Sequence, residues 1–272
     1  MRGILIAVWA LGVLGPWGPA AAQQVMVSPG SVIFEGRDRG GEVFVVNTGD
    51  TTATYRIEPA HFVMNEDGVL TEVAGEQPPD SAVGMLRYSP RQFQLRPGES
   101  QTIRLAVRKP ASLAPGEYRA HLKITNLGEV SDRPTIGEPD GTFARIKLRV
   151  TRAIRVVVRH GVSAADASLA GVSARKAGAE QIELSFQLKK ASKSSSRGEY
   201  VLFARDRGSG TTTEKFVHRG VIVYPEVASR SVSHAIPAAS LQGALELCVS
   251  YRNTEGARKG RSETRCVDPG TL

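Results

Sequence analysis

Few side chains in this sequence have types and spacings that could support catalysis. Five histidines are scattered without the spacing of metal ligands: His61, His121, His160, His218 and His234. His121 lies in a predicted strand, so we interpret it as a structural residue and not as a general base. The adjacent carboxylates Glu66 and Asp67 could form an acid–base pair, but Gly68 follows them, and this combination is typical of a hairpin turn.

The signatures of nucleotide-binding and hydrolytic sites are also missing from the sequence. It has no Gly-rich phosphate loop, no His-Glu-x-x-His pair and no nucleophile elbow. Ser89 and Ser100 fall in predicted turns without an adjacent base. We therefore expect a protein that is not an enzyme, with no catalytic residue, no metal and no cofactor.

The two cysteines, Cys248 and Cys266, lie near the C-terminus and enclose a short segment. In an oxidising compartment such a pair is expected to form a disulfide. The alternative, a metal site, needs further Cys or His residues at ligand spacing, and none lies nearby in the sequence.

Residues 1–22 have the pattern of a cleaved signal peptide. Arg2 supplies a positive charge, an apolar run extends from Ile4 to Leu14, and the segment ends in the small residues Ala20–Ala22. The alternative is an uncleaved membrane anchor, but the run is shorter than the roughly 20 residues that span a bilayer. We expect an exported protein without stable membrane insertion, whose mature chain starts near Gln23.

The formal net charge of +8 and the pI near 9.7 are compatible with an acidic partner, an anionic membrane surface or nucleic acid. Aromatic residues make up only 6% of the chain, which argues against platforms for base stacking. An exported protein also rarely meets nucleic acid. We therefore expect no nucleic-acid partner and interpret the charge as a feature of partner binding or solubility.

Short apolar and β-branched runs alternate with turn signals from Val25 onward. The strands predicted in the first half are 25–27, 31–34, 43–47, 55–57, 62–64, 93–95, 102–107 and 118–124, with a hairpin turn at 65–68. Those predicted in the second half are 182–188, 200–204, 216–223, 244–251 and 262–267. This spacing, with almost no helical periodicity, predicts an all-β fold of antiparallel sandwiches.

The composition changes after His160. Residues 163–179 are small and polar, and 189–197 is interpreted as a turn rich in lysine and serine. We place a domain boundary near 160–163, which predicts an N-terminal sandwich at 23–160 and a C-terminal sandwich at 161–272. Both have an ordinary domain size.

One predicted strand, residues 143–159, is unusually long. It contains no Gly or Pro and would reach about 55 Å if fully extended. Its even positions from Ala144 to Val158 are largely apolar, whereas its odd positions carry five of the segment's basic side chains, from Arg145 to Arg159. Residues 126–141, which precede it, are rich in Gly, Pro, Asp and Glu and are predicted to be a loop.

The segment 87–105, RYSPRQFQLRPGESQTIRL, carries a family resemblance. It resembles the P-x-x-F/V-x-L-x-P-G-x-x-Q-x-I/V-R signature of the periplasmic pilus-assembly chaperones. Three shorter segments are similar to other parts of that family, in the same order and spacing: 32–36, 42–47 and 115–119. The resemblance covers residues 25–160 well. Beyond them it rests on domain size and on a C-terminal disulfide hairpin.

The resemblance implies two immunoglobulin-like domains at an angle. It also implies that the protein binds its partners by adding a strand to them. Such chaperones add a strand to a pilus (fimbrial) subunit that lacks its last one, and they deliver the subunit to an outer-membrane usher. The donor side chains fall on Ile146, Leu148 and Val150, and the location implied is the periplasm. Strand addition of this kind takes affinity from main-chain hydrogen bonds and specificity from alternate side chains. Periodicity alone equally allows these three residues to face the domain's own core.

The family also holds the C-terminal carboxylate of the subunit with two basic residues. One of them aligns on Arg155, which could bind a carboxylate bidentately; the alternative is a solvated strand charge. The other, an Arg in the first strand, aligns on Ser31. This departure leaves Arg37 or Arg39 as a possible substitute, or a weaker anchor.

Two other functions are compatible with this sequence. They are a non-chaperone immunoglobulin-like envelope or adhesion protein and an exported hydrolase on a β-sandwich. The long loop 126–141 does not assign the chain to the short-loop or the long-loop group of the family. If the apolar face of 143–159 turns outward, this strand is expected at a sheet edge with its cationic side in water.

Overall fold

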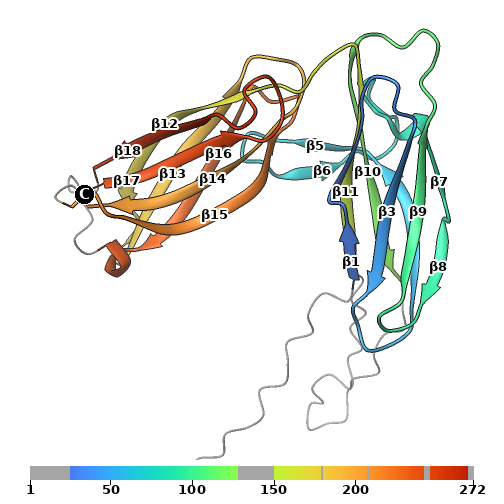
Figure 1. Ribbon diagram of the computed structural model, residues 1–272, viewed down its shortest axis with the longest axis horizontal. Coiled ribbons are helices and arrows are strands. Elements are labelled where there is room, and N and C mark those ends of the chain that lie inside the picture. The colour runs from blue at the N-terminus through green and yellow to red at the C-terminus, as the bar shows by residue number, and fades with distance from the viewer. Residues whose placement is uncertain (1–24, 128–149, 179, 207–208, 242–245, 269–272) are drawn as a thin grey trace, which may run out of the picture.

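The computed structural model describes residues 25–127, 150–178, 180–206, 209–241 and 246–268. These residues form two β-sandwiches set at an angle, as Figure 1 shows. The only helical elements among them are the short 3-10 turns η1 (Val83–Met85) and η2 (Ala238–Leu241). The predicted signal peptide, residues 1–22, lies outside the described residues. No helix in the described ranges is long and apolar enough to cross a membrane.

The first sandwich packs two sheets face to face. One sheet has the order β1-β3-β9-β7 and the other β2-β11-β10-β4-β8. Their strands are β1 (Val25–Ser28), β2 (Ser31–Phe34), β3 (Gly40–Asn47), β4 (Ala53–Ala60), β7 (Leu86–Ser89), β8 (Gln92–Leu95), β9 (Ser100–Val107), β10 (Gly116–Asn126) and β11 (Thr151–His160). Alternate apolar residues of both sheets fill the core between them.

The second sandwich has sheets of the order β12-β13-β16 and β15-β14-β17-β18. Its strands are β12 (Ala167–Lys176), β13 (Gln181–Lys190), β14 (Ser196–Arg205), β15 (Thr212–Val223), β16 (Ser229–Pro237), β17 (Glu246–Asn253) and β18 (Ser262–Val267). Seven strands in sheets of three and four are typical of an immunoglobulin-like sandwich.

Sequence patterns located most of these strands but missed four of them: β6 (Leu70–Glu72), β7, β12 and β16. β12 is built largely from Ser, Ala and Gly, and β16 contains three Ser, one Ala and one Pro, so neither has a strong β pattern of its own. They form because their sparse apolar residues, such as Leu169 and Ile236, are buried in the second core.

The strand β11 differs from the expected edge strand with a solvated cationic face. It lies between β10, to which it is antiparallel, and β2, which pairs with it in parallel from Arg155 to Val158. Ile154, Val156 and Val158 enter the first core, whereas Arg155, Val157 and Arg159 are buried on the opposite face. That face is covered by the second sandwich, which is why its charges are not in water.

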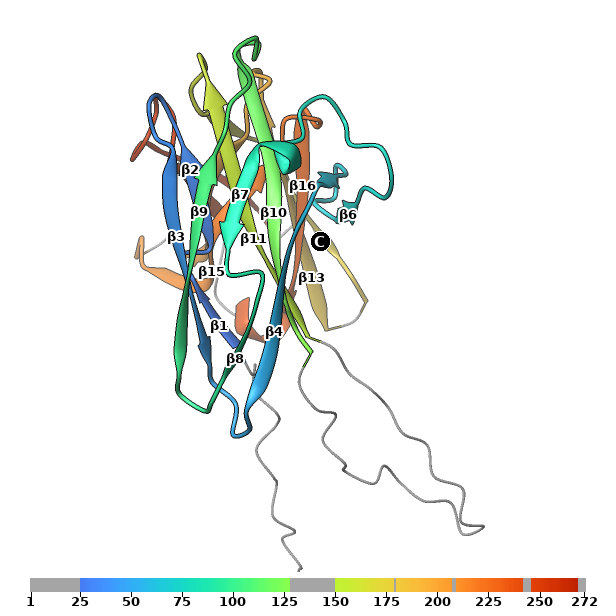
Figure 2. The ribbon, with the colours of Figure 1, turned by 90° about the vertical axis from the view of Figure 1, so that its right-hand side faces the viewer.

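A hairpin of the first sandwich reaches the second one. It consists of β5 (Phe62–Met64) and β6, joined by the predicted turn at 65–68, and in both Figure 1 and Figure 2 it lies beside β16. Met64 belongs to the core of the second sandwich. At the tip, the amide of Ser231 donates to the Glu66 carbonyl at 2.7 Å.

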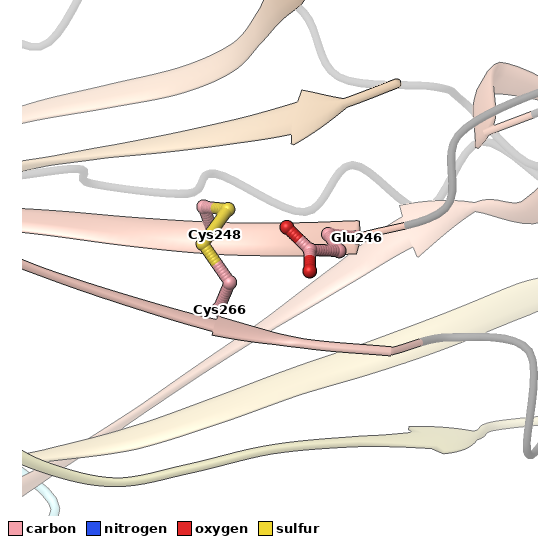
Figure 3. Close-up of side chains that lie close together, drawn as sticks. All are labelled: Glu246, Cys248 and Cys266. Atoms are coloured by element: carbon pink, nitrogen blue, oxygen red, sulfur yellow. A yellow bond between two sulfur atoms is a disulfide. The ribbon is translucent and has the colours of Figure 1, made fainter. Parts of the chain in front are cut away.

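The predicted disulfide joins Cys248 of β17 to Cys266 of β18, which are paired directly across the two strands. Glu246 lies next to them, as Figure 3 shows. This trio is the one group of potential metal ligands found among the described residues. Because the two sulfurs are bonded to each other, they are not thiolate ligands.

Candidate functional site

The candidate site is the face of β10 and β11 that the second sandwich covers. Three cross-strand pairs build it: Glu117 with Arg159, Arg119 with Val157, and His121 with Arg155. All six residues are at most 6% exposed, although five of them are ionisable. Alternation places these side chains on one face because the intervening residues of both strands point into the first core.

Arg155 contacts the second sandwich at two points. Its Nη1 donates to the Ser195 hydroxyl at 3.1 Å, and its Nη2 donates to Oε1 of Glu255 at 3.4 Å. Burial lowers the pKa of the Arg155 guanidinium, and the negative charge of Glu255 acts against this shift. The basic residue is therefore not a solvated strand charge; it is a buried cation with one carboxylate from the other domain.

Arg159 lies four residues after Arg155 on the same face of β11 and has three carboxylate partners. Its Nε donates to Glu117 at 3.0 Å, its Nη2 donates to Glu255 at 2.8 Å, and its Nη1 donates to Glu35. Burial alone would lower the pKa of Arg159, but hydrogen bonds to Glu255 and Glu35 and the charge of Glu117 raise it above its usual value. Glu117 also accepts a hydrogen bond from the Ser195 amide at 3.2 Å. Arg159 thus bonds carboxylates of its own sandwich, Glu117 and Glu35, and one carboxylate of the second sandwich, Glu255.

Arg119 forms a separate charged group nearer to the hairpin. Its Nη2 donates to Asp80 at 3.0 Å and to Glu226 at 2.8 Å, and its guanidinium carbon lies 4.6 Å from the centre of the Tyr224 ring. Glu226 also accepts the Met64 amide at 2.6 Å. One carboxylate of the second sandwich therefore holds both the strand β10 and the hairpin strand β5.

His121 is neutral in this site. Its Nε2 lies 2.8 Å from the Tyr224 hydroxyl, and burial, with the positive charges of Arg119 and Arg155, lowers its pKa to about 3. His61, also buried, has its Nδ1 3.1 Å from the Arg119 carbonyl oxygen.

Several buried polar atoms on this face have no hydrogen-bond partner among the described residues. Across the described residues, seven buried side-chain atoms lack a hydrogen-bond partner, and five of them belong to this site. They are Nε of Arg155, Nε of Arg119, Nε2 of His61, Nδ1 of His121 and Oε1 of Glu117. Native proteins rarely leave such atoms unpaired, so their concentration here marks this face as a candidate functional site.

Two grooves flank the charged contact. One, of about 550 Å³, is lined by Glu35, Arg159, Glu255 and Lys259, among others. The other, of about 910 Å³, is lined on its polar side by Asp80, Glu117 and Glu226. The Arg159–Glu255 pair is therefore accessible from solvent through the smaller groove, although Arg159 itself is buried.

The outer edge of β11 is open next to this site. Because β2 pairs with β11 only from Arg155 to Val158, no described strand pairs with that edge over Thr151–Ile154. Arg155 is the first residue beyond the open stretch. A strand that added to this edge would end near the Arg155 guanidinium if its C-terminus pointed that way.

The other predicted site residues are distributed as follows. Ile146 and Leu148 lie outside the described residues. Val150 is half-buried just before β11, and its carbonyl accepts the Asn126 amide at 3.0 Å.

Of the residues considered for a second anchor, Ser31 pairs in register with Arg155, whereas Arg37 and Arg39 are exposed in the turn between β2 and β3. Arg39 there donates to the carbonyls of Gly36 and Asp38.

Sequence reasoning missed several residues of this site: His61, Arg119, Ser195, Glu226 and Glu255. Arg119 had a usable signal, because Glu117, Arg119 and His121 alternate with apolar residues in one predicted strand. Ser195, Glu226 and Glu255 lie in connecting segments. Nothing in their local sequence shows that the domain angle brings them to β11.

No family model and no curated protein matches the sequence. Among solved structures, the chain is similar to the class 5 fimbriae chaperone CfaA, with 14% identity, a TM-score of 0.44, and 90% of this chain and 99% of that chain covered. It is similar to the CupB2 chaperone of Pseudomonas aeruginosa, with 12% identity, a TM-score of 0.41, and 89% and 100% covered. It is also similar to the ASH/PapD-like domain of human CEP192, with 11% identity, a TM-score of 0.33, and 56% and 96% covered.

Proposed function

We propose that this protein is a periplasmic chaperone that holds fimbrial subunits by adding a strand to them and delivers them to an outer-membrane usher. The observation that carries the proposal is the position of Arg155. This buried guanidinium lies in the angle between the two sandwiches, directly beyond the open edge of β11. A strand edge supplies a main-chain ladder, and a guanidinium next to it supplies a fixed end point for a carboxylate.

In this proposal, the anchor sets the register of the added strand. A subunit carboxylate bound at Arg155 would fix which of its residues face Val150, Leu148 and Ile146. Val150 lies five positions from Arg155, which is about 17 Å along an extended strand. Since a slip by one residue turns every side chain to the opposite face, such an end point makes capture specific. Covering the open subunit edge would also prevent its aggregation.

Co-expression with a candidate fimbrial subunit in the periplasm tests the proposal. Wild-type protein should protect the subunit and co-purify with it, whereas Leu148→Glu should reduce recovery at least about tenfold, because a charge cannot enter an apolar groove without a large desolvation cost. The matched control is Lys147→Glu, which places the same residue at a neighbouring position that strand alternation predicts to face the opposite way, and which should retain most of the capture.

Two results would contradict the proposal. If wild-type protein stabilises no subunit, the non-chaperone envelope or adhesion role replaces it. If Leu148→Glu captures subunits as well as wild type, residues 146–150 are not the donor strand.

A further inference from the structure

The strongest unexplained feature of the site is that its anchor already holds a carboxylate. Glu255 of the second sandwich accepts from Arg155 at 3.4 Å and from Arg159 at 2.8 Å. We propose that Glu255 is an internal competitor for the carboxylate-binding position of Arg155, so that a partner carboxylate binds by displacing it. This inference rests on the proposed function and adds the way in which the site is regulated.

Charge balance explains why such a competitor is needed. A buried guanidinium without a counter-charge is strongly destabilising, and Arg155 is only 3% exposed. Among the described residues, Glu255 is the only carboxylate that forms an ion pair with Arg155. A partner carboxylate that takes its place keeps the charge of the site unchanged. The exchange therefore never leaves the buried Arg155 guanidinium without a counter-charge, whereas simple removal of Glu255 would.

The pairing of Arg155 is weak enough to be exchanged. The Nη2–Oε1 distance of 3.4 Å is long for a charge-assisted hydrogen bond. The Nε of Arg155 also has no partner among the described residues. A carboxylate that bound both Nε and Nη2 would satisfy this donor and would gain the bidentate geometry that Glu255 does not achieve.

Glu255 also has a position to move to. Its side chain borders the 550 Å³ groove, and Arg197, whose side chain is 37% exposed, lies 3.9 Å from it on the outer side. The backbone is held on both sides: the Thr254 amide donates to the Arg197 carbonyl at 2.9 Å, and the Arg258 amide donates to Oδ1 of Asp166 at 2.9 Å. The exchange is therefore a rotation of the Glu255 side chain and not a movement of its loop.

The test compares two forms of one probe. A synthetic peptide with the sequence of the last strand of the co-purified subunit is made as the free acid and as the C-terminal amide, and dissociation constants are measured by fluorescence anisotropy. Wild type should prefer the acid. Glu255→Gln should increase the acid-to-amide preference about tenfold, the size of one charge-assisted hydrogen bond, and Arg155→Ala should abolish the preference.

Glu226→Gln is the matched control, because it removes a carboxylate that bridges the same domains through Arg119 and not through Arg155. It should leave the acid-to-amide ratio at the wild-type value. If Glu255→Gln does not fold, Glu255→Asp retains the charge but shortens the reach to Arg155, and its ratio should lie above that of wild type.

The outcomes separate the two proposals. If wild type prefers the acid but the Glu255 variants show the same ratio, the competitor role is wrong and the anchor at Arg155 remains. If wild type binds acid and amide equally, or if no subunit is captured, the anchor itself is wrong and the competitor role falls with it. An equal increase in Glu226→Gln would mean that domain loosening, not carboxylate competition, controls binding.

Discussion

The two sandwiches are joined by two contacts of different chemistry. At one contact, Arg155 and Arg159 of β11 meet Glu255 and Ser195 through charged and polar groups beside an open groove. At the other, the β5–β6 hairpin lies against β16 and buries Met64 in the second core. The charged contact can exchange one partner for another of equal charge. The hairpin contact cannot, because an apolar side chain leaves a cavity when it withdraws.

This difference assigns separate roles to the two contacts. The hairpin contact fixes the angle between the domains, since it combines the burial of Met64 with the main-chain hydrogen bond from Ser231 to Glu66. At that angle, the polar groups of the charged contact are buried, and each buried polar atom without a partner lowers stability. A change at either contact should therefore affect stability, but only the charged contact should respond to pH and to anionic partners.

The largest effect is expected from breaking the charged contact at Arg159. Arg159→Ala would leave Glu117 buried without its guanidinium partner, and removal of one member of a buried pair typically costs about 3–5 kcal/mol of unfolding free energy. Urea denaturation measures the change. Arg265→Ala, which removes a half-exposed arginine, is the control and should cost less than about 1 kcal/mol. Equal losses in the two variants would show that the charged contact is not structural.

Breaking the hairpin contact should have the next largest effect. Met64→Ala removes a side chain that is 6% exposed in the second core, and we expect a loss of about 2–4 kcal/mol in unfolding free energy. Met26→Ala is the matched control, because Met26 is 52% exposed and its truncation should cost less than about 0.5 kcal/mol. A Met64→Ala protein as stable as the Met26→Ala protein would contradict the proposed role of the hairpin.

A smaller effect should distinguish the contacts by their response to pH. Burial, with the charges of Arg119 and Arg155, lowers the pKa of His121 from its ordinary value of 6.5 to about 3, so the folded state favours the neutral ring. Its contribution to stability is complete above pH 6.5 and is lost as the pH falls through the window from 6.5 to 3. Between pH 6.5 and 5 the loss should be about 2 kcal/mol at most.

The measurement is the unfolding free energy of wild type and His121→Gln at several pH values. The variant should lose less stability on acidification than wild type, and Met64→Ala should follow the wild-type pH dependence. Parallel curves for wild type and His121→Gln would show that His121 does not link the charged contact to pH.

The strands of this protein could be predicted where apolar and polar residues alternate clearly, as in β10 and β13. β12 and β16 were missed because their small residues acquire their positions from the partner sheet and not from their own propensity. The hairpin turn at 65–68 was predicted from local residues, but its contact with β16 was not. That contact depends on the angle between domains, which no local pattern records.

The candidate site was predictable to a similar degree. Arg155 was identified through the family resemblance as a carboxylate anchor in the cleft, with a solvated strand charge as the alternative, but the buried groups around it were not predicted. The charges of β11 had the same alternation as an exposed strand face, and only the second sandwich distinguishes a covered face from an exposed one. Ser195 and Glu255 complete the site across long sequence separations, so the sequence placed the cation but not its partners.

The burial of Met64 has a consequence for the order in which the chain folds. The second sandwich is complete in its strands from Ala167 onward, but not in its core, because one of the core side chains is supplied by a residue synthesised about a hundred positions earlier. A fragment that starts at residue 161 would close around an empty space. Because the first sandwich supplies Met64, the second sandwich can finish packing its core only after the hairpin has docked on it.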